Sequence, residues 1–532
     1  MTDSSPTDSS PTDSPPTDSS PTDSPPADSA AAESSPPATG ATADLAAALS
    51  DIVGPTNVLV DSDLRSPFET DWTRRFGGPA LLVVRPGSTG EVAATVRACA
   101  GLGVGIVVQG GNTGLVGGGV PAPGPPGPPG EGRGEAADSA PAGVPDGAPD
   151  GALGEALRAA QVVILSTVRL TRLEPVDAVA AQVTAGAGVP LARLQEAAAR
   201  AGLAFGVDLA ARDSATVGGM VATNAGGLHV LRYGAMRAQV IGLEAVLADG
   251  TVVSRLSGLV KDNTGYDLSQ LLVGSEGTLG VITAARLRLV ADHPEKVVAL
   301  LGLAGTAEAL EVLAAMRRRV EGLQAAELFY DDGLELVRAH AGLAAPLPHP
   351  WPAYLVVECA GLSDPSEPLF EVLAELDWPE AATAVATDPA GQARLWAYRE
   401  RHTEAISALG VPHKLDVTLP QARLADFEAE VRRVVAESAP GSRLVLFGHV
   451  GDGNLHVNVV GPPSDDERVD DAVLRLVASM DGSISAEHGV GRAKVRWLGL
   501  SRTATELAAM RAIKGALDPA GLLNAGVLLE GA

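Results

Sequence analysis

The chain has 532 residues and carries 65 acidic against 39 basic side chains, a formal net charge of −26. Such a charge repels phosphate backbones and anionic lipid, so it argues against nucleic acid and membrane surfaces as partners. Only two cysteines occur, Cys99 and Cys359, which excludes a disulfide framework and a cysteine-ligated iron–sulfur cluster. With no leader of the basic-then-apolar kind and no apolar run of about 18 residues, we expect a cytoplasmic protein without a membrane span.

Composition divides the chain into four parts. Residues 1–42 consist largely of TDSSP-type repeats without apolar side chains, and we expect a disordered acidic tail. A lead segment over 43–75 precedes the region 76–292, which we expect to bind a cofactor, and residues 293–530 form a second region. The stretch over 121–155 is rich in Pro and Gly, and we interpret it as a disordered insertion in a surface loop.

Short strands and helices alternate along the first region, which predicts α/β layers. The predicted elements there are a strand over 81–86, a helix over 88–103 that begins at Ser88 or Thr89, and strands over 104–110 and 161–170. The second region continues with a helix over 305–322, a strand over 354–359, and a helix followed by a strand within 394–420.

Three glycine-rich loops occur within 175 residues, over 109–119, 211–227 and 273–283. Backbone without side chains can wrap a phosphate closely, with successive N–H groups directed at the anion. One such loop is usually a plain tight turn, but three together predict a large, phosphorylated cofactor. The dinucleotide spacing G-x-G-x-x-G and the phosphate-binding G-x-x-x-x-G-K-[ST] are both absent, which argues against nicotinamide binding and phosphoryl transfer.

Taken in this order, the strings QGGNTGLVGGG, ATVGGMVATNAGG and EGTLGVIT resemble the FAD-binding domain of the vanillyl-alcohol-oxidase/p-cresol-methylhydroxylase superfamily, and within it the 2-hydroxy-acid dehydrogenase branch. The resemblance covers about residues 70–530. It implies an α+β fold, with a two-subdomain α/β FAD-binding domain of the p-cresol-methylhydroxylase type and an α+β substrate cap. By this resemblance the residues that line FAD are Gly110, Gly111, Asn112, Thr113, Gly114, Leu115, Gly117, Gly118, Ser214, Thr216, Gly218, Gly219, Asn224, Gly277, Ile282 and Asn524.

Two positions bear on how the flavin is held. Relatives with a covalent flavin commonly have His directly after the paired glycines, where this chain has Asn112, so we expect a noncovalent flavin at that position. The C-terminal LNAGVLL resembles the family's last segment, but Ala525 and Val527 replace its Pro and Lys, and only Asn524 is retained.

A pair of histidines flanks a predicted hairpin in LVLFGHVGDGNLHVNVV, residues 444–460. Asp-Gly between apolar runs is a strong hairpin signal. A turn centred on Asp452 and Gly453, with a two- or four-residue loop, places His449 directly opposite His456, about 4.5–5.5 Å apart at Cβ. A three- or five-residue loop breaks this register. A hydrogen-bonded structural pair is the alternative to a metal site.

The segment SAEHGVGR, residues 485–492, supplies a carboxylate and a third imidazole. Two His and one carboxylate form a catalytic metal pattern that suits Zn²⁺ but also Mn²⁺ or Fe²⁺. The resemblance points the same way, with His449, His456 and Glu487 as ligands of a divalent metal, expected to be Zn²⁺, and His488 as base.

The block over 394–420 contains Arg399 and Thr403, four residues apart on an expected helix face, and Lys414 in the following strand. A guanidinium, a hydroxyl and an ammonium suit a carboxylate, although spacing alone favours a solvated helix face. The resemblance implies that this block binds the substrate's carboxylates. We also expect Asn458, on the face of the histidines, to contact substrate.

The sequence thus predicts an FAD-linked 2-hydroxy-acid dehydrogenase that oxidises a D-2-hydroxy acid, with D-2-hydroxyglutarate the expected substrate, to the 2-oxo acid. The C2 hydrogen would pass as hydride to flavin N5 while His488 removes the hydroxyl proton. The alternatives are a D-lactate or glycolate dehydrogenase of the same branch, a non-redox or carbohydrate-oxidising member of the fold, and a flavin-less binding protein that uses the tail. The candidate electron acceptors are an electron-transfer flavoprotein, a quinone or a cytochrome. The sequence leaves open whether the chain forms a homodimer.

Overall fold

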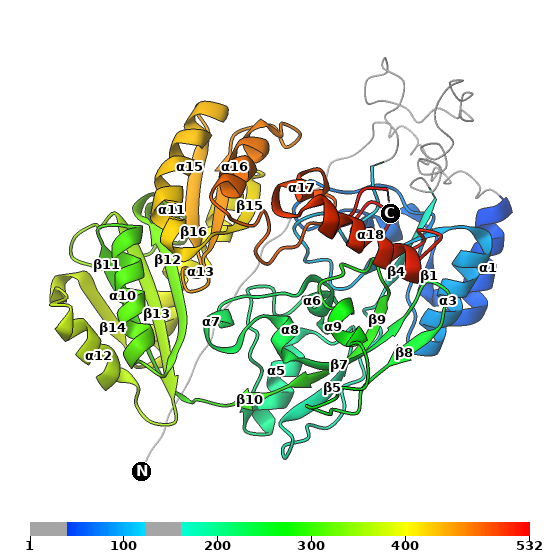
Figure 1. Ribbon diagram of the computed structural model, residues 1–532, viewed down its shortest axis with the longest axis horizontal. Helices are drawn as coiled ribbons and strands as arrows, with labels where there is room; N and C mark the ends of the chain where they lie inside the picture. The colour runs from blue at the N-terminus through cyan, green and yellow to red at the C-terminus, as the bar shows by residue number, and fades with distance from the viewer. Residues whose placement is uncertain (1–39, 124–160, 532) are drawn as a thin grey trace, which may run out of the picture. The chain divides into compact units, whose positions relative to one another are not determined.

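The computed structural model describes residues 40–123 and 161–531. The expected tail over 1–42 and the expected insertion over 121–155 therefore lie almost entirely outside the described residues. By their contacts the described residues belong to one compact unit, and their strands form three main sheets and one two-stranded ribbon (Figure 1). None of the helices in this part of the chain is long and apolar enough to cross a bilayer.

The first sheet has the order β1–β2–β4–β3, and its strands are β1 (Val58–Leu59), β2 (Leu82–Val84), β3 (Gly105–Gln109) and β4 (Val162–Ser166). The last three strands run parallel, as strand–helix alternation predicts. Its helical elements are α1 (Gly40–Val53), η1 (Pro55–Asn57), α2 (Ser62–Glu69) and α3 (Thr89–Leu102). The Ser88 side chain caps α3 and Gly103, at φ +64°, ends it, which confirms the predicted start.

The second sheet is antiparallel throughout, with the order β5–β9–β7–β8. Its strands are β5 (Gln182–Gly186), β7 (Val240–Val246), β8 (Val252–Ser254) and β9 (Val281–Arg288), and the ribbon pairs β6 (Leu203–Ala204) with β10 (Val290–Ala291). The helices of this part are α5 (Leu191–Arg200), α6 (Val217–Thr223), α7 (Val230–Tyr233), α8 (Met236–Gln239) and α9 (Leu268–Leu272). Among the described strands, parallel pairs therefore occur in the first sheet and not in the second.

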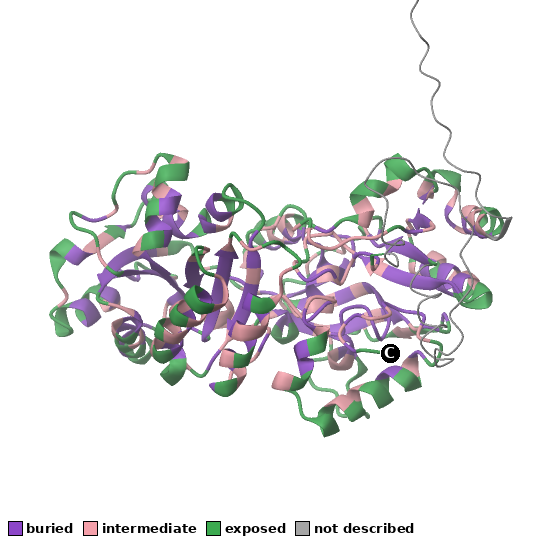
Figure 2. Ribbon diagram, turned by 90° about the horizontal axis from the view of Figure 1, so that it is seen from above, coloured by how far each residue is buried: buried purple, intermediate pink, exposed green. Residues whose placement is uncertain are grey.

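The third sheet is antiparallel and has the order β14–β11–β13–β12–β16–β17–β15. Its strands are β11 (Glu295–Leu303), β12 (Leu323–Tyr330), β13 (Ala353–Gly361), β14 (Thr383–Ala386), β15 (His413–Thr418), β16 (Arg443–Gly448) and β17 (Asn454–Val460). Alternate residues of β11 enter two different cores, Val297 and Ala299 one of them, Val298 and Leu300 the other. Both faces of this sheet are therefore covered, and its strands are mostly buried (Figure 2).

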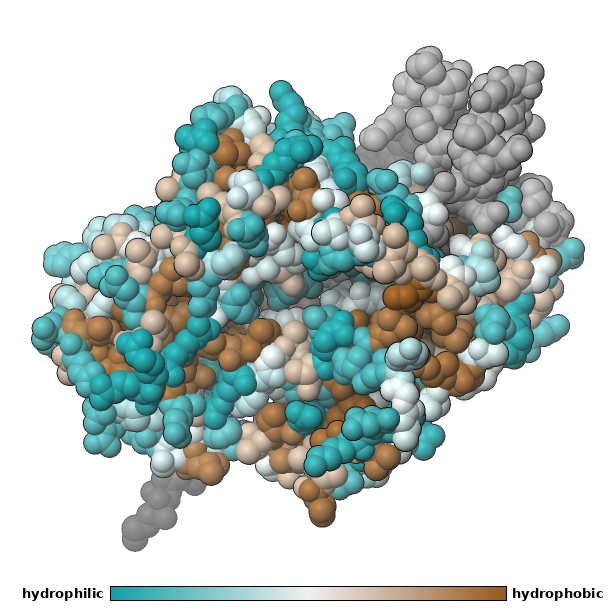
Figure 3. All heavy atoms as spheres, viewed as in Figure 1, coloured by the Kyte–Doolittle hydropathy of each residue, from teal (hydrophilic) through white to brown (hydrophobic). Residues whose placement is uncertain are grey.

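Helices on the two faces complete these cores. One face carries α10 (Thr306–Arg319), α12 (Ser366–Glu375), α15 (Leu424–Ser438) and α16 (Arg468–Ser479). The other carries α11 (Asp331–Ala341), α13 (Pro389–Glu400) and α14 (His402–Ser407). The short turn η2 (Glu380–Ala382) lies between α12 and β14, and η3 (Gln421–Arg423) lies between β15 and α15. Hydrophilic side chains alternate with smaller apolar patches on the face drawn in Figure 3.

After the third sheet the chain returns to the first. The return passes through η4 (Val495–Trp497), α17 (Leu498–Ser501) and α18 (Ala504–Leu517). Ile106 of β3 donates its N–H to the carbonyl of Leu522 and accepts from the N–H of Asn524, each at 2.8 Å. The loop over 485–492 precedes this return, and Arg492 at its end donates its N–H to the carbonyl of Val116 in the first glycine loop at 2.9 Å.

Candidate active site

The three glycine-rich loops line one cavity of about 570 Å³. Close packing of the loops requires glycine: a Cβ on Gly111 would come within 1.8 Å of the carbonyl oxygen of Ser214. All of the predicted cofactor residues line this cavity except Asn224. The expected substrate and metal residues line the same cavity, and they are Arg399, Thr403, Lys414, His449, His456, Asn458, Glu487 and His488.

Asn224 has a structural role instead. It ends α6 in the left-handed conformation at φ +52°, which Asn tolerates better than most residues. Its side-chain oxygen accepts the backbone N–H of Arg237 at 2.8 Å. A sequence motif alone does not show which of its residues face the cofactor and which shape the loop.

The loops fit an FAD. A Cβ on Gly114 would meet no atom within 4 Å, so the loop there borders open space. The hydroxyl of Thr216 is buried at the cavity wall and has no hydrogen-bond partner. A glycine cradle with an unpaired polar group is what a phosphorylated cofactor requires.

Two asparagines of the predicted set use their amides to hold the cradle together. Asn524 accepts the N–H of Val108 at 2.7 Å and donates to the carbonyl of Glu276 at 2.6 Å. Asn112 donates to the carbonyls of Thr70 at 2.9 Å and Pro67 at 3.3 Å. Asn112 thereby attaches the lead segment to the first glycine loop.

The hairpin register differs from the prediction by two residues. Phe447, not His449, pairs with His456, and the loop between β16 and β17 has five residues, 449–453. The carbonyl of His449 accepts the N–H of both Asp452 and Asn454, which makes the turn wider. His449 is therefore the first residue of the loop rather than a strand residue. The two imidazoles still meet, with ring centroids 5.3 Å apart.

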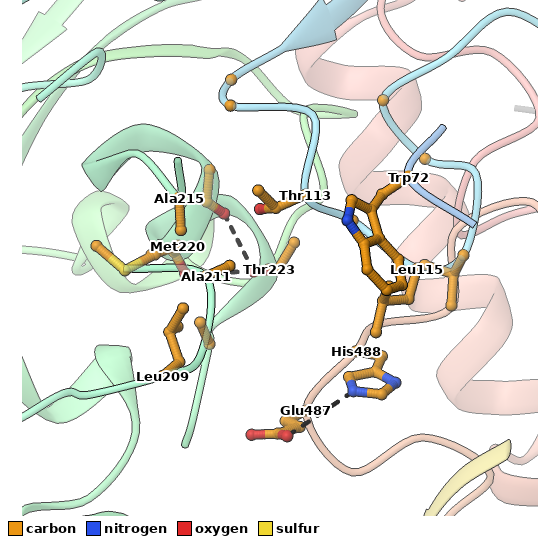
Figure 4. A pocket seen from close by; sticks show the side chains of 18 of the residues that line it. Trp72, Thr113, Leu115, Leu209, Ala211, Ala215, Met220, Thr223, Glu487 and His488 are labelled. Atoms are coloured by element: carbon orange, nitrogen blue, oxygen red, sulfur yellow. Dashed lines mark hydrogen bonds and ion pairs between the residues drawn. The ribbon is translucent and has the colours of Figure 1, made fainter. Parts of the chain in front are cut away.

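Three imidazoles converge on one oxygen of Glu487. Its Oε1 lies 3.5 Å from Nε2 of His449, 3.8 Å from Nε2 of His456 and 3.8 Å from Nε2 of His488. Its Oε2 accepts the N–H of Gly227, at the end of the second glycine loop, at 2.8 Å. Figure 4 shows Glu487 and His488 at the edge of the cavity. The arrangement joins the histidine hairpin to the FAD cradle.

Two further carboxylates stand behind the histidines, and sequence reasoning missed both. Glu327 of β12 accepts from Nδ1 of His449 at 2.6 Å, and Asp416 of β15 lies 3.4 Å from Nδ1 of His456. Each carboxylate fixes its imidazole with Nε2 toward Glu487. This carboxylate–histidine arrangement is typical of metal sites. Both carboxylates are fully buried within apolar strands, and a charged residue inside such a strand is the signal that could have identified them.

Asp416 also places the loop that carries Glu487 and His488. Its Oδ2 accepts three successive N–H groups, from Ala486 at 3.2 Å and from Glu487 and His488 at 2.8 Å each. Burial alone would raise the pKa of Asp416, but His488 and then His456 lower it well below its usual value. The ligand atoms of four residues lie within 4.8 Å of one another and could hold a metal ion. These residues are Asp416, His456, Glu487 and His488.

The pKa values of the cluster follow from burial and from its charges. Burial tends to raise the pKa of Glu487, but the hydrogen bond and charge of His449 outweigh it and lower the pKa, so Glu487 is ionised. Burial lowers the pKa of His488 to about 4, which makes this imidazole neutral at neutral pH. Burial lowers the pKa of His449, but the charge and hydrogen bond of Glu327 outweigh burial and raise it well above its usual value, so this imidazole carries a proton that a metal would displace.

The expected carboxylate clamp is assembled differently from the prediction. The helix breaks at Arg401, so Arg399 lies in the last turn of α13 and Thr403 lies in α14, rather than both on one helix face. Arg399 is buried, with Nε 2.8 Å from Glu327 and its guanidinium over the ring of Phe447 at 4.4 Å. Both Arg399 and Thr403 still line the cavity.

Lys414 lies in β15 directly opposite Asn458 of β17. Its ammonium stands 4.8 Å from the centre of the Trp72 ring. Among the described residues no carboxylate pairs with it, and burial lowers its pKa to about 8. An ammonium without a counter-charge in a cavity is a site for an anion.

A further carboxylate joins the third glycine loop to the loop of Glu487. Glu276 is buried and accepts the N–H of Val490 at 2.8 Å and of Gly491 at 2.7 Å. Its backbone has φ +51°, which turns the EGTLG loop. Burial raises the pKa of Glu276, although these two N–H groups lower it in part.

Comparisons with known proteins identify the family of the chain. A family model described as FAD binding domain matches residues 144–255, and one described as FAD linked oxidases, C-terminal domain, matches residues 292–528. D-2-hydroxyglutarate dehydrogenase of Xanthomonas citri is 38% identical over 86% of this chain and 91% of its own. The mitochondrial D-2-hydroxyglutarate dehydrogenase of Bos taurus is 37% identical over 92% and 84%.

The fold has solved counterparts. A crystal structure of p-cresol methylhydroxylase with substrate bound superposes with a TM-score of 0.66, at 16% identity, over 92% of this chain and 97% of that one. This likeness confirms the predicted two-subdomain FAD fold with a cap. The alternative of a flavin-less binding protein is set aside, because both family models describe FAD proteins. The chain belongs to the family of FAD-linked oxidases that contains the D-2-hydroxyglutarate dehydrogenases, and it is an FAD-dependent hydroxy-acid dehydrogenase.

Proposed function

We propose that the enzyme oxidises D-2-hydroxyglutarate to the corresponding 2-oxo acid, with a divalent metal held by His449, His456 and Glu487. The observation that carries the proposal is a cavity with two separate polar ends. Three imidazoles converge on Glu487 at one end, and an ammonium without a counter-charge stands at the other. The relatives named D-2-hydroxyglutarate dehydrogenase support the choice of this substrate.

The spacing between the two ends fits a dicarboxylate. Lys414 is two residues from Asp416 in β15, and the same step separates Asn458 from His456 in β17. Residues two apart share a strand face and lie about 7 Å apart. The three C–C bonds between the hydroxyl-bearing carbon and the distal carboxyl carbon span less than this step, and the long side chain of Lys414 covers the difference. Lys414 and Arg399 would hold the distal carboxylate, and Asn458 lies between that group and the histidines.

His488 is placed to accept the hydroxyl proton. It is neutral at neutral pH, because burial lowers its pKa, and it lies beside the oxygen on which the other two imidazoles converge. A divalent metal at this point would act as a Lewis acid and lower the pKa of the substrate hydroxyl. FAD supplies the acceptor for the hydride when it is bound in the cradle. Glu327 and Asp416 keep His449 and His456 in the tautomer with Nε2 free.

FAD is held noncovalently at the first glycine loop in this proposal. Asn112 occupies the position of a flavin-bearing His, and its amide is already used by the carbonyls of Thr70 and Pro67. Denaturation of the purified protein should therefore release the flavin into solution, whereas flavin that stays with the precipitated chain contradicts this part of the proposal.

The proposed reaction is tested with a panel of acids. Purified enzyme is assayed with D- and L-2-hydroxyglutarate, D-lactate and glycolate and an artificial electron acceptor. The proposal predicts the highest kcat/KM for D-2-hydroxyglutarate. A higher kcat/KM for D-lactate or glycolate would assign the enzyme to a monocarboxylate instead.

A further inference from the structure

The lead segment before the first sheet reaches into the active site. Residues 70–77 form a tight loop closed by a bridge between Thr70 and Gly77. The carboxylate of Asp71 accepts the hydroxyl of Thr73 at 2.7 Å and the N–H of Phe76 at 3.3 Å. Asn112 holds the start of the loop through the carbonyl of Thr70. This loop is therefore fixed both by its own contacts and by the cradle.

Trp72 is the residue that this loop presents to the cavity. It lines the same cavity as His488 and Lys414, and Figure 4 shows its ring on the side of the cavity where His488 lies. The residue is half exposed, at 51%. Lys414 directs its ammonium at the ring from 4.8 Å, and no other partner of that ammonium occurs among the described residues.

We propose that Trp72 is a specificity-determining residue, which covers the ammonium of Lys414 and excludes water from its ion pair with the distal carboxylate of the substrate. This inference rests on the proposed function. The ring attracts the cation from one face and leaves the rest of the ammonium directed into the cavity. An ion pair strengthens when water is kept from it. The monocarboxylates of the panel have no group that reaches this position.

The experiment compares Trp72→Ala and Trp72→Phe, each in the native chain and in a Lys414→Met background. For D-2-hydroxyglutarate, Trp72→Ala should raise KM by about threefold to thirtyfold, the range of a cation–π contact that is partly desolvated. D-lactate should be affected less than twofold, and Trp72→Phe should retain most of the native selectivity because it keeps an aromatic face. Tyr266→Ala, which removes an exposed aromatic outside the cavity, serves as control.

The double variant shows whether Trp72 acts through Lys414. If it does, Trp72→Ala should cause no further selective loss once Lys414 is Met. The FAD absorbance spectrum of each variant reports whether the cradle is intact. Retained diacid selectivity in Trp72→Ala, or an equal loss for both acids, overturns the inference.

The outcomes also separate this inference from the proposed function. Selective loss in Lys414→Met without selective loss in Trp72→Ala overturns the role of Trp72 alone. If Lys414→Met changes both acids alike, the distal-carboxylate clamp itself fails, and the role of Trp72 fails with it.

Discussion

Glu327 accepts a hydrogen bond from Nδ1 of His449 at 2.6 Å and so directs Nε2 of that imidazole toward Glu487. The same carboxylate faces Nε of Arg399 at 2.8 Å. One buried anion therefore orients an expected metal ligand and offsets the charge of an expected substrate-binding residue. The proposed metal ligands and the proposed carboxylate clamp are therefore joined through Glu327.

Glu327→Gln tests this link. A neutral amide cannot offset Arg399 and is a weaker acceptor for His449, so metal affinity should fall by about ten- to a hundredfold. The measurement is metal content after dialysis against a graded series of chelator concentrations. Glu358→Gln is the matched control, since Glu358 is a buried carboxylate of the neighbouring strand β13 that does not line the cavity. Unchanged metal retention in Glu327→Gln would show that this carboxylate does not support the site.

Metal removal should separate the metal cluster from the FAD cradle. A tight chelator should abolish turnover while the FAD spectrum persists, because the ligands His449, His456 and Glu487 lie outside all three glycine loops. Activity should return when a divalent metal is restored, and His449→Ala should hold neither metal nor activity. Full activity in protein shown by elemental analysis to be metal-free would show that the reaction needs no metal.

Substitution of Lys414 tests the clamp. Lys414→Met should lower kcat/KM for D-2-hydroxyglutarate by roughly ten- to a hundredfold, because a charge-assisted contact contributes about 1.5–3 kcal/mol. The loss should appear mainly in KM, and D-lactate should be little affected. An equal loss for both acids would place Lys414 at the carboxylate next to the reacting carbon. No effect on either acid would mean that Lys414 does not bind the substrate and is a solvated residue.

The pH dependence should follow the same lysine. Burial lowers the pKa of Lys414 to about 8, so its charge is present below that pH and is lost above it. The kcat/KM for D-2-hydroxyglutarate should therefore decline above about pH 8. In Lys414→Arg the charge persists to higher pH, so the decline should move upward or disappear. An identical alkaline limb in both proteins would assign that limb to another group.

Glu276→Gln should destabilise the chain. A Gln has one acceptor oxygen for the two buried N–H groups of Val490 and Gly491, so one of them loses its partner. The expected loss is about 1–3 kcal/mol in the free energy of unfolding. Chemical denaturation of the FAD-loaded protein measures it, with the exposed Glu311→Gln as control. Equal stability of the two variants would mean that Glu276 does not anchor the Glu487 loop.

Much of the site was predictable from the chain because its residues sit in compact strings. The cradle loops and the histidines are each local in sequence, and despite an error of two residues in the hairpin register the rings of His449 and His456 lie 5.3 Å apart. Glu327 and Asp416 were missed because single carboxylates in apolar strands carry no motif. Their role depends on β12 pairing with β16 and on β15 pairing with β17, which no local pattern indicates.

The helix break at Arg401 was missed for a related reason. The residues around it are ordinary helix formers, so propensity predicts one continuous helix, and tertiary packing decides otherwise. The role of Trp72 was equally hidden, since a single aromatic in a lead segment gains meaning only when Asn112 and Lys414 are near it.

The most direct measurement is the reduction of bound FAD in the absence of any acceptor. Metal-loaded enzyme is mixed anaerobically with D-2-hydroxyglutarate, L-2-hydroxyglutarate or D-lactate, and the flavin absorbance is followed in time. D-2-hydroxyglutarate should bleach the flavin rapidly and completely at the lowest concentrations, and its L-enantiomer should not bleach it. A flavin that stays oxidised with D-2-hydroxyglutarate but bleaches with D-lactate would contradict the proposed substrate.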